Sequence, residues 1–146
     1  MTNEVTVRRA SRDDSAAVSP LLDQLGYPVT PDELAGRFDR VAGAPGDAAW
    51  VAIDGSDVIV GFAAGHLFLP FELRSPVAEL TALVVDEQRR RGGAGRGLVA
   101  AFETWATAAG AVRFSVATAF RRHDAHAFYE RLGYEQLARK YEKQPA

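Results

Sequence analysis

Cysteine is absent from this sequence of 146 residues. Thiol nucleophiles, thiolate metal ligands and disulfide frameworks are therefore excluded. Long apolar runs are also missing: the best one, residues 58–65, ends before His66 and falls far short of the ~20 residues that a transmembrane helix needs. The first four residues, Met-Thr-Asn-Glu, lack the basic flank and apolar stretch of a signal peptide. We therefore expect a soluble, cytoplasmic protein that has no membrane partner.

A bulk positive charge is missing as well, because 17 basic and 19 acidic side chains give a formal net charge of −2. This balance argues against a nucleic acid as a partner. The charges are nevertheless unevenly distributed. Residues 1–87 carry 6 basic and 14 acidic side chains, a net −8, whereas residues 88–146 carry 11 basic and 5 acidic ones, a net +6. The first part therefore suits a cationic ligand and the second an anionic one.

The chain offers no place for a domain boundary, since it contains no internal repeat, low-complexity tract or Ser/Pro-rich linker. Its length and its 47% hydrophobic content are those of one globular domain. A domain of this size buries roughly 68–70% of the surface of its unfolded chain, so it needs no disulfide or metal to hold it together. We expect a single domain over residues 1–146, with its core over residues 4–142.

Alternating strand and helix patterns predict an α/β fold built on a mixed sheet. Residues 30–33 place a proline in a first helical turn with acidic residues beside it, and Gly26 ends the helix before them. Residues 77–85 are apolar except for Glu79 and Thr81, a pattern typical of a central strand covered on both faces. Strands are expected at residues 5–7, 49–53, 58–69, 77–85, 112–118 and 134–142, and helices at residues 11–25, 30–41, 95–110 and 123–132.

A glycine- and arginine-rich loop, residues 89–97, lies between a predicted buried strand and a predicted amphipathic helix. Glycines let the backbone approach a ligand closely, the first amides of a helix have no internal partner, and guanidinium groups suit phosphate oxygens. A pyrophosphate is the expected ligand of this loop. The loop lacks the Gly-Lys-Ser/Thr ending of a Walker A loop, and Leu98 stands where a dinucleotide fingerprint needs its third glycine. A basic, solvated loop that only caps a helix is the alternative.

Two segments together resemble the GCN5-related N-acetyltransferase (GNAT) family. The loop Arg90-Arg91-Gly92-Gly93-Ala94-Gly95 is similar to the family's Arg/Gln-x-x-Gly-x-Gly/Ala loop, and residues 125–134 resemble the family's downstream Phe/Leu-Tyr-Glu-x-x-Gly-Phe/Tyr segment. The resemblance implies one N-acetyltransferase domain with a mixed, mostly antiparallel central sheet, a splayed strand pair and about four flanking helices. It also implies acetyl-CoA as the cosubstrate and no metal.

The resemblance assigns cofactor contacts to three parts of the chain. Backbone groups of one strand bind the pantetheine arm, the glycine-rich loop surrounds the pyrophosphate, and a guanidinium group replaces an asparagine that many relatives carry near the start of the downstream helix. The residues are, in that order, Leu83, Val84 and Val85; Arg90, Arg91, Gly92, Gly93, Ala94, Gly95 and Arg96; and Arg122.

Two catalytic residues are expected. Tyr129 corresponds to the family tyrosine beside the cofactor sulfur, and a phenol of pKa ~10 is able to donate a proton to a departing thiolate. An aromatic residue that only packs between helix and sheet is the alternative. Glu79 is the candidate general base, because the two-residue repeat of a strand places Glu79, Thr81 and Leu83 on one face. An exposed Glu79 at the strand start, with water as the base, is the alternative.

The expected reaction is direct transfer of acetyl to a primary amine of a small cationic molecule through a ternary complex. A peptide or protein amine as acceptor, or an acyl-CoA sensor or interaction module without turnover, remain as alternatives. Residues 23–48 and 70–76 are expected to form the acceptor groove, and His66 is either part of it or an ordinary strand histidine. His123 and His126 have metal-ligand spacing, but no third ligand is evident and no metal is expected. A homodimer is left open.

Overall fold

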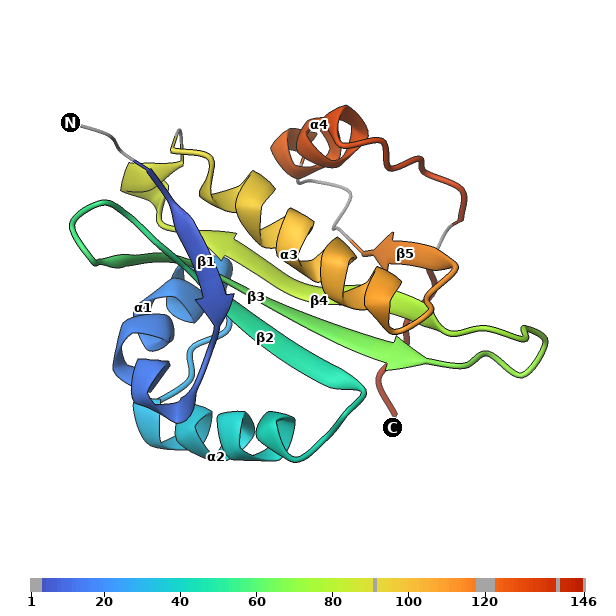
Figure 1. The fold of residues 1–146 in the computed structure, drawn as a ribbon, viewed down its shortest axis with the longest axis horizontal. Coiled ribbons are helices and arrows are strands. Elements are labelled where there is room, and N and C mark those ends of the chain that lie inside the picture. Colours follow the sequence, from blue (N-terminus) through green and yellow to red (C-terminus); the bar gives the residue numbers. More distant parts are fainter. Residues whose placement is uncertain (1–3, 91, 118–122, 139, 146) are drawn as a thin grey trace.

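A computed structural model describes residues 4–90, 92–117, 123–138 and 140–145. Five strands form one sheet in the order β1-β2-β3-β4-β5 (Figure 1). Neighbouring strands are antiparallel except for β4 and β5, which are parallel, so the sheet is mixed and mostly antiparallel as expected. The elements are β1 (Thr6–Arg9), α1 (Ser15–Leu25), α2 (Pro31–Ala42), β2 (Asp47–Ile53), β3 (Ile59–Phe68), β4 (Val77–Val85), α3 (Ala94–Ala108), β5 (Arg113–Val116) and α4 (His123–Arg131), with 3-10 turns at Arg12–Asp14 and Glu87–Arg89.

The helices cover the two faces of the sheet, and Figure 1 shows α1 and α2 on one side and α3 on the other. On the α3 face, Leu98 and Phe102 are fully buried against Trp50 and other strand residues. On the α1/α2 face, Val18 and Phe38 pack in a second cluster with strand residues such as Phe62. The three central strands, β2, β3 and β4, thus contribute side chains to two separate cores. Within the described residues, none of the helices combines the length and the apolar character required to span a bilayer.

The helix ends follow the local sequence. Gly26 adopts a left-handed φ of 101° directly after α1, which suits a residue without a side chain. At the start of α2, the backbone N–H of Glu33 donates to Thr30 Oγ1 at 3.2 Å. Ahead of α1, the buried carboxylate of Asp14 accepts two hydrogen bonds from Arg8, at 2.8 and 2.9 Å, and one from the backbone N–H of Ser11. The hydrogen bonds from Arg8 are the main reason why the pKa of Asp14 is lowered.

Two expected strands differ from the structure. The prediction of a last strand at residues 134–142 is wrong: the described residues there are not in a strand, Tyr134 turns toward α3, and Leu137 and Tyr141 are 82% and 89% exposed. The expected buried strand at residues 112–118 is shorter and only half-buried, with four residues in β5. Among the described strands, β5 pairs with β4 alone, so it lies at an edge and cannot be covered like a central strand.

Candidate functional site

The pairing between β4 and β5 ends in the middle of β4, at a point that we call the β4–β5 divergence. Their pairing runs from Val77 opposite Arg113 to Leu80 opposite Val116, while β4 continues to Val85. The last four residues of β4, Ala82–Val85, therefore pair with β3 on one side, and on the other side no described strand pairs with them. The expected splayed strand pair agrees with this end of the pairing, at which β5 itself stops. The end of the pairing leaves backbone groups of Leu83 and its neighbours open to a ligand, which fits an extended, amide-bearing chain such as a pantetheine arm.

A β-bulge on β4 lies at the same point. Ala64 of β3 is opposite Ala82, but the next residue, Gly65, is opposite Leu80, so Thr81 is an extra residue in β4. Its hydroxyl donates to the backbone carbonyl of Ala64 at 3.2 Å. Gly65 lies tightly against α3, since a Cβ there would be 2.8 Å from the ring of Phe102.

The bulge corrects the expected placement of Glu79. Leu80 and Leu83 both pack in the core on the α3 face, which a strict two-residue repeat would not allow. Because Glu79 adjoins Leu80, it lies on the opposite face, the one covered by α1 and α2. The prediction that Glu79, Thr81 and Leu83 share one face is therefore wrong for Glu79, since the extra residue reverses the alternation between Glu79 and Leu83.

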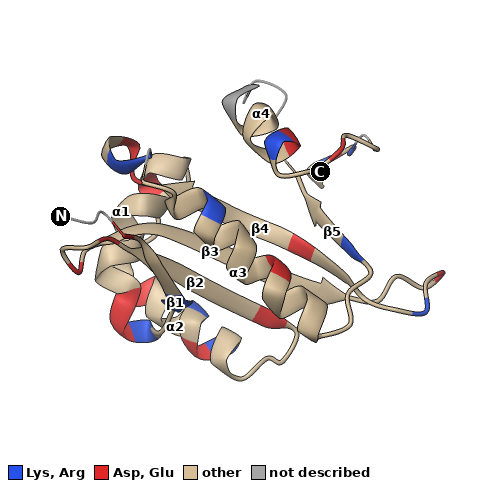
Figure 2. Ribbon diagram, turned by 45° about the horizontal axis from the view of Figure 1, so that its top comes forward, with Lys and Arg blue, Asp and Glu red and all other residues tan. Residues whose placement is uncertain are grey.

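A row of polar residues crosses four strands on this α1/α2 face. Asp47 of β2 is opposite His66 of β3, His66 is opposite Glu79 of β4, and Glu79 is opposite Ser115 of β5. We refer to Asp47, His66 and Glu79 as the acidic row. The pair Glu79–Ser115 directly precedes the last β4–β5 pair, so the row runs beside the β4–β5 divergence. Figure 2 shows acidic segments on β4 and at the start of β2.

His66 is held on two sides within the acidic row. Its Nδ1 lies 2.6 Å from Oδ1 of Asp47, and its ring is stacked on that of Phe68 with an interplanar angle of 11° and 6.1 Å between centroids. The side chain of His66 remains 48% exposed. Sequence reasoning named His66 and Glu79 but missed Asp47, because only the strand register reveals that Asp47 and His66, 19 positions apart, are partners.

The glycine-rich loop leads from β4 into the first turn of α3. Gly93 precedes the helix with a left-handed φ of 84°, and Ala94 is fully buried behind it. A Cβ at Gly95 would lie 3.2 Å from the ring of Phe128 and 3.7 Å from Val85, so α4, the loop and the end of β4 meet here. The first backbone amides of this 15-residue helix have no hydrogen-bond partner within the helix and lie at the glycine-rich loop, an arrangement that fits an anionic pyrophosphate.

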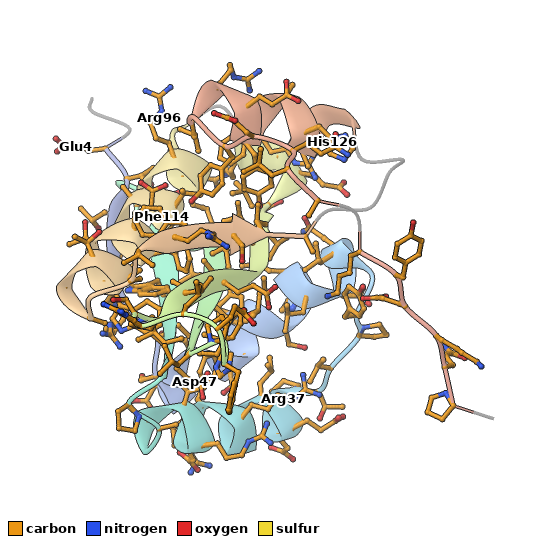
Figure 3. All side chains as sticks on the ribbon, turned by 90° about the vertical axis from the view of Figure 1, so that its right-hand side faces the viewer. Glu4, Arg37, Asp47, Arg96, Phe114 and His126 are labelled. Atoms are coloured by element: carbon orange, nitrogen blue, oxygen red, sulfur yellow. The ribbon has the colours of Figure 1, made fainter. Side chains whose placement is uncertain are left out.

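The arginines of the loop are not equivalent. Arg89 forms an ion pair with Asp54 in the β2–β3 turn, so its guanidinium is already engaged. The pKa of Asp54 is lowered, chiefly because the backbone N–H of Val58 donates to it. Arg90 and Arg96 are exposed, and Figure 3 shows the Arg96 side chain pointing away from the body of the protein. The other two predicted arginine contacts, Arg91 and Arg122, lie outside the described residues.

Tyr129 lies in the core between α4 and the α3 side of the sheet, and 8% of it is exposed. Its ring meets those of Phe128 and Tyr134 edge to face, with centroids 5.3 and 5.7 Å away. The hydroxyl of Tyr134 donates to Glu103 Oε2 of α3 at 2.8 Å, and its backbone N–H donates to the carbonyl of Tyr129 at 3.0 Å. Burial, and then the Glu103 carboxylate, raise the pKa of Tyr134. Tyr129 therefore sits in a rigid aromatic cluster.

Some of the acidic residues in the first part of the chain are neutralised by arginine. Asp39, one of the residues expected to face the acceptor, forms an ion pair of 2.8 Å with Arg12. The structure describes no cluster of three or more His, Asp or Glu side chains suited to a metal ion, and the His123 side chain lies outside what it describes.

Comparison with known proteins finds consistent matches. A model of the acetyltransferase (GNAT) family matches residues 17–134. An aminoglycoside N(6')-acetyltransferase type 1 from Stenotrophomonas maltophilia is 31% identical over 138 residues, which cover 92% of this chain and 88% of that protein. An aminoglycoside N-acetyltransferase in complex with CoA has a TM-score of 0.83 at 22% identity, covering 97% of this chain and 95% of that one. Glucosamine-6-phosphate N-acetyltransferase from Arabidopsis thaliana has a TM-score of 0.82 at 19% identity, covering 96% and 97%.

Proposed function

This chain belongs to the acetyltransferase (GNAT) family and is an N-acetyltransferase, and we propose that it transfers acetyl from acetyl-CoA directly to a primary amine of a small cationic molecule. The observation that carries the proposal is the position of the acidic row beside the β4–β5 divergence. Carboxylates there attract a protonated amine to the place where the family's cosubstrate arrives.

In this proposal the cosubstrate lies along the second half of β4. Backbone groups of Leu83, Val84 and Val85 bind the pantetheine arm, because β5 ends before it reaches them. The pyrophosphate meets the loop from Arg90 to Arg96, where the amides at the start of α3 and the exposed guanidinium groups are available. Acetyl-CoA supplies the activated acyl group, and the chain contributes binding, orientation and proton transfer.

The two proposed catalytic residues lie on opposite faces of the sheet. Tyr129 belongs to the α3 side and Glu79 to the α1/α2 side, and β4 beyond Leu80, which no described strand pairs with on its β5 side, lies between them. In this proposal the thioester lies at the β4–β5 divergence, and the phenol of Tyr129 donates a proton to the departing thiolate. Glu79 binds the amine as its counter-ion, and this amine, which is mostly protonated at neutral pH, must lose a proton before it attacks. With no cysteine in the chain, we propose no acyl-enzyme step through a thiol.

An aminoglycoside is the acceptor class we favour, because the 31% identical relative is named for it. Aminoglycosides carry several ammonium groups, which suits a row with two carboxylates. The two carboxylates belong to strands on either side of β3, roughly 10 Å apart by ordinary strand spacing. A second ammonium of the same acceptor is therefore able to reach Asp47 while the reacting one lies at Glu79.

The acceptor is tested by measuring CoA release with a thiol-detecting reagent over a panel of aminoglycosides, polyamines, simple alkyl amines and peptides. We expect release with compounds that bear two or more amines, with the highest kcat/KM for aminoglycosides. Background release with every acceptor, while acetyl-CoA binds tightly, would refute the proposal and favour an acyl-CoA sensor. Preference for peptides would instead indicate a protein or peptide amine as the substrate.

Tyr129→Phe separates an enzyme from a sensor. Loss of the phenolic proton donor is expected to lower kcat by about 10²-fold, while the Kd for acetyl-CoA stays unchanged because the ring and its packing remain. Tyr141→Phe is the matched control, since Tyr141 is 89% exposed and should affect neither quantity. A Tyr129→Phe enzyme with full turnover would remove Tyr129 from the mechanism.

A further inference from the structure

We propose that His66, held by Asp47, takes up the proton that the acceptor ammonium must lose, while Glu79 binds and orients that ammonium. The proposal rests on the acetyltransferase function proposed above and assigns a specific base within it. It follows from the contacts of His66 and from its place in the sheet.

The contact with Asp47 fixes the tautomer of His66. A carboxylate accepts hydrogen bonds only, so the ring nitrogen 2.6 Å from Asp47 Oδ1, which is Nδ1, must carry the hydrogen. In the neutral imidazole the lone pair then lies on Nε2, which is the atom that accepts a proton. Asp47 also stabilises the imidazolium that forms, and the stacked ring of Phe68 restricts rotation of the imidazole. Both contacts orient His66 before the acceptor arrives.

The strand register places His66 beside the proposed reaction. It is directly opposite Glu79, where side chains on one face of an antiparallel pair have Cβ atoms about 5 Å apart. Glu79 in turn adjoins the last β4–β5 pair, at the β4–β5 divergence. An ammonium bound to Glu79 thus has an imidazole next to it, and the part of β4 that has no β5 partner begins two residues further along, at Thr81. The charged groups on the strands that flank His66 are Asp47 on β2 and Glu79 on β4, and both favour a cation between them.

The chemistry divides naturally between the two side chains. A carboxyl has an ordinary pKa of about 4.3 and an imidazole one of about 6.5, so an imidazole is the better proton acceptor near neutral pH and a carboxylate the better permanent counter-ion. Glu79 therefore serves to hold the ammonium. The side chain of Glu79 is only partly buried, so water still reaches it, which suits binding of the ammonium more than removal of its proton.

The protons balance in the following way. One N–H proton of the ammonium moves to Nε2 of His66, which leaves a neutral amine. The amine nitrogen attacks the thioester carbon, a C–N bond forms and the C–S bond breaks. As the amide forms, the nitrogen loses a second proton. The CoA thiolate takes up one proton, so these two changes cancel. His66 then releases its proton to water, for which its 48% exposed side chain is accessible.

The test compares His66→Gln and Asp47→Asn with wild type in the CoA-release assay, at saturating acetyl-CoA and acceptor and over a range of pH. Asp57→Asn is the matched control, because Asp57 is exposed at the turn of the same β2–β3 hairpin, at the end opposite to Asp47. We expect His66→Gln to lower kcat by about 10²-fold and to abolish the decline of kcat at acidic pH. Asp47→Asn should lower kcat less and retain that decline. Added imidazole should restore activity to His66→Ala but not to Asp47→Asn.

The outcomes separate this inference from the proposed function. If wild type shows no turnover with any acceptor, the proposed function fails. If wild type is active and His66→Gln keeps its kcat and its pH profile, or only raises the KM for the amine, the role of His66 as proton acceptor is refuted while the acetyltransferase function stands. Unchanged Kd values for acetyl-CoA and unchanged melting temperatures of the variants show that the fold is retained.

Discussion

Removing one hydroxyl from the aromatic cluster around Tyr129 tests how that cluster is held. The hydroxyl of Tyr134 donates to Glu103 at 2.8 Å and thereby ties the segment after α4 to α3. Tyr134→Phe keeps the ring contact with Tyr129 but leaves the Glu103 carboxylate without this donor. A hydrogen bond to a charged group contributes about 1.5–3 kcal/mol, and Glu103 is only partly buried, so water compensates for part of the loss. We expect the free energy of unfolding to fall by about 1–2 kcal/mol.

Urea unfolding at neutral pH measures this loss, and alkaline pH supplies a second check. Because folding raises the pKa of Tyr134, the native state keeps a phenolic proton that the unfolded chain releases above pH ~10. The contribution of Tyr134 is therefore complete below that pH and decreases as the pH rises further. The difference in stability between wild type and Tyr134→Phe should shrink above pH ~10. Tyr141→Phe is the control for the same chemical change at an exposed position. Equal stability of Tyr134→Phe and wild type at neutral pH would refute the reasoning.

Three further substitutions test packing and charge. Asp14→Asn should destabilise the fold by about 1–3 kcal/mol at neutral pH, because the buried carboxylate accepts three hydrogen bonds. Because folding lowers the pKa of Asp14, its carboxylate stabilises the fold above the ordinary pKa of about 3.9, and this stabilisation is lost as the pH falls below that value. In urea melts the difference in free energy of unfolding between wild type and Asp14→Asn should therefore shrink on acidification. A difference that stays constant would contradict this account. Gly65→Ala should lower the free energy of unfolding by about 1–3 kcal/mol, since its Cβ would lie 2.8 Å from the ring of Phe102. Gly36→Ala, on the open side of α2, should raise it by about 0.5–1 kcal/mol. Thermal melts in which the melting temperatures of both variants change in the same direction would contradict this packing argument.

Local features of the sequence predicted the helices well. The proline and acidic residues at positions 30–33 specify the start of α2, and Gly26 ends α1, because these effects depend on residues within one turn. The glycine-rich loop was placed correctly for the same reason, between a central strand and the first turn of α3.

Strand register was not predictable from the same patterns. If residues 53 and 58 ended their strands opposite each other, as the expected strand limits suggest, Asp47 would lie opposite Ala64. In the structure the turn is longer and an irregularity follows Ala52, so Asp47 lies opposite His66. A shift of two residues keeps the faces but changes every partner, and hydrophobic alternation does not detect it.

The bulge at Thr81 was hidden for a related reason. Residues 77–85 are apolar toward both cores, so the sequence shows no break in alternation where the extra residue enters. The error at residues 134–142 has a different cause. Tyr134 is half-buried by its contacts with Glu103 of α3 and with the ring of Tyr129, and local sequence patterns do not reveal these contacts.

The central claim is direct transfer of acetyl to an amine at the β4–β5 divergence. Mass spectrometry of a reaction containing the enzyme, acetyl-CoA and an aminoglycoside measures the acceptor and the protein together with the CoA released. The account predicts one acetylated acceptor for each CoA released, and a protein whose mass stays unchanged throughout. CoA release without an acetylated acceptor, or accumulation of an acetylated protein as an intermediate, would contradict it.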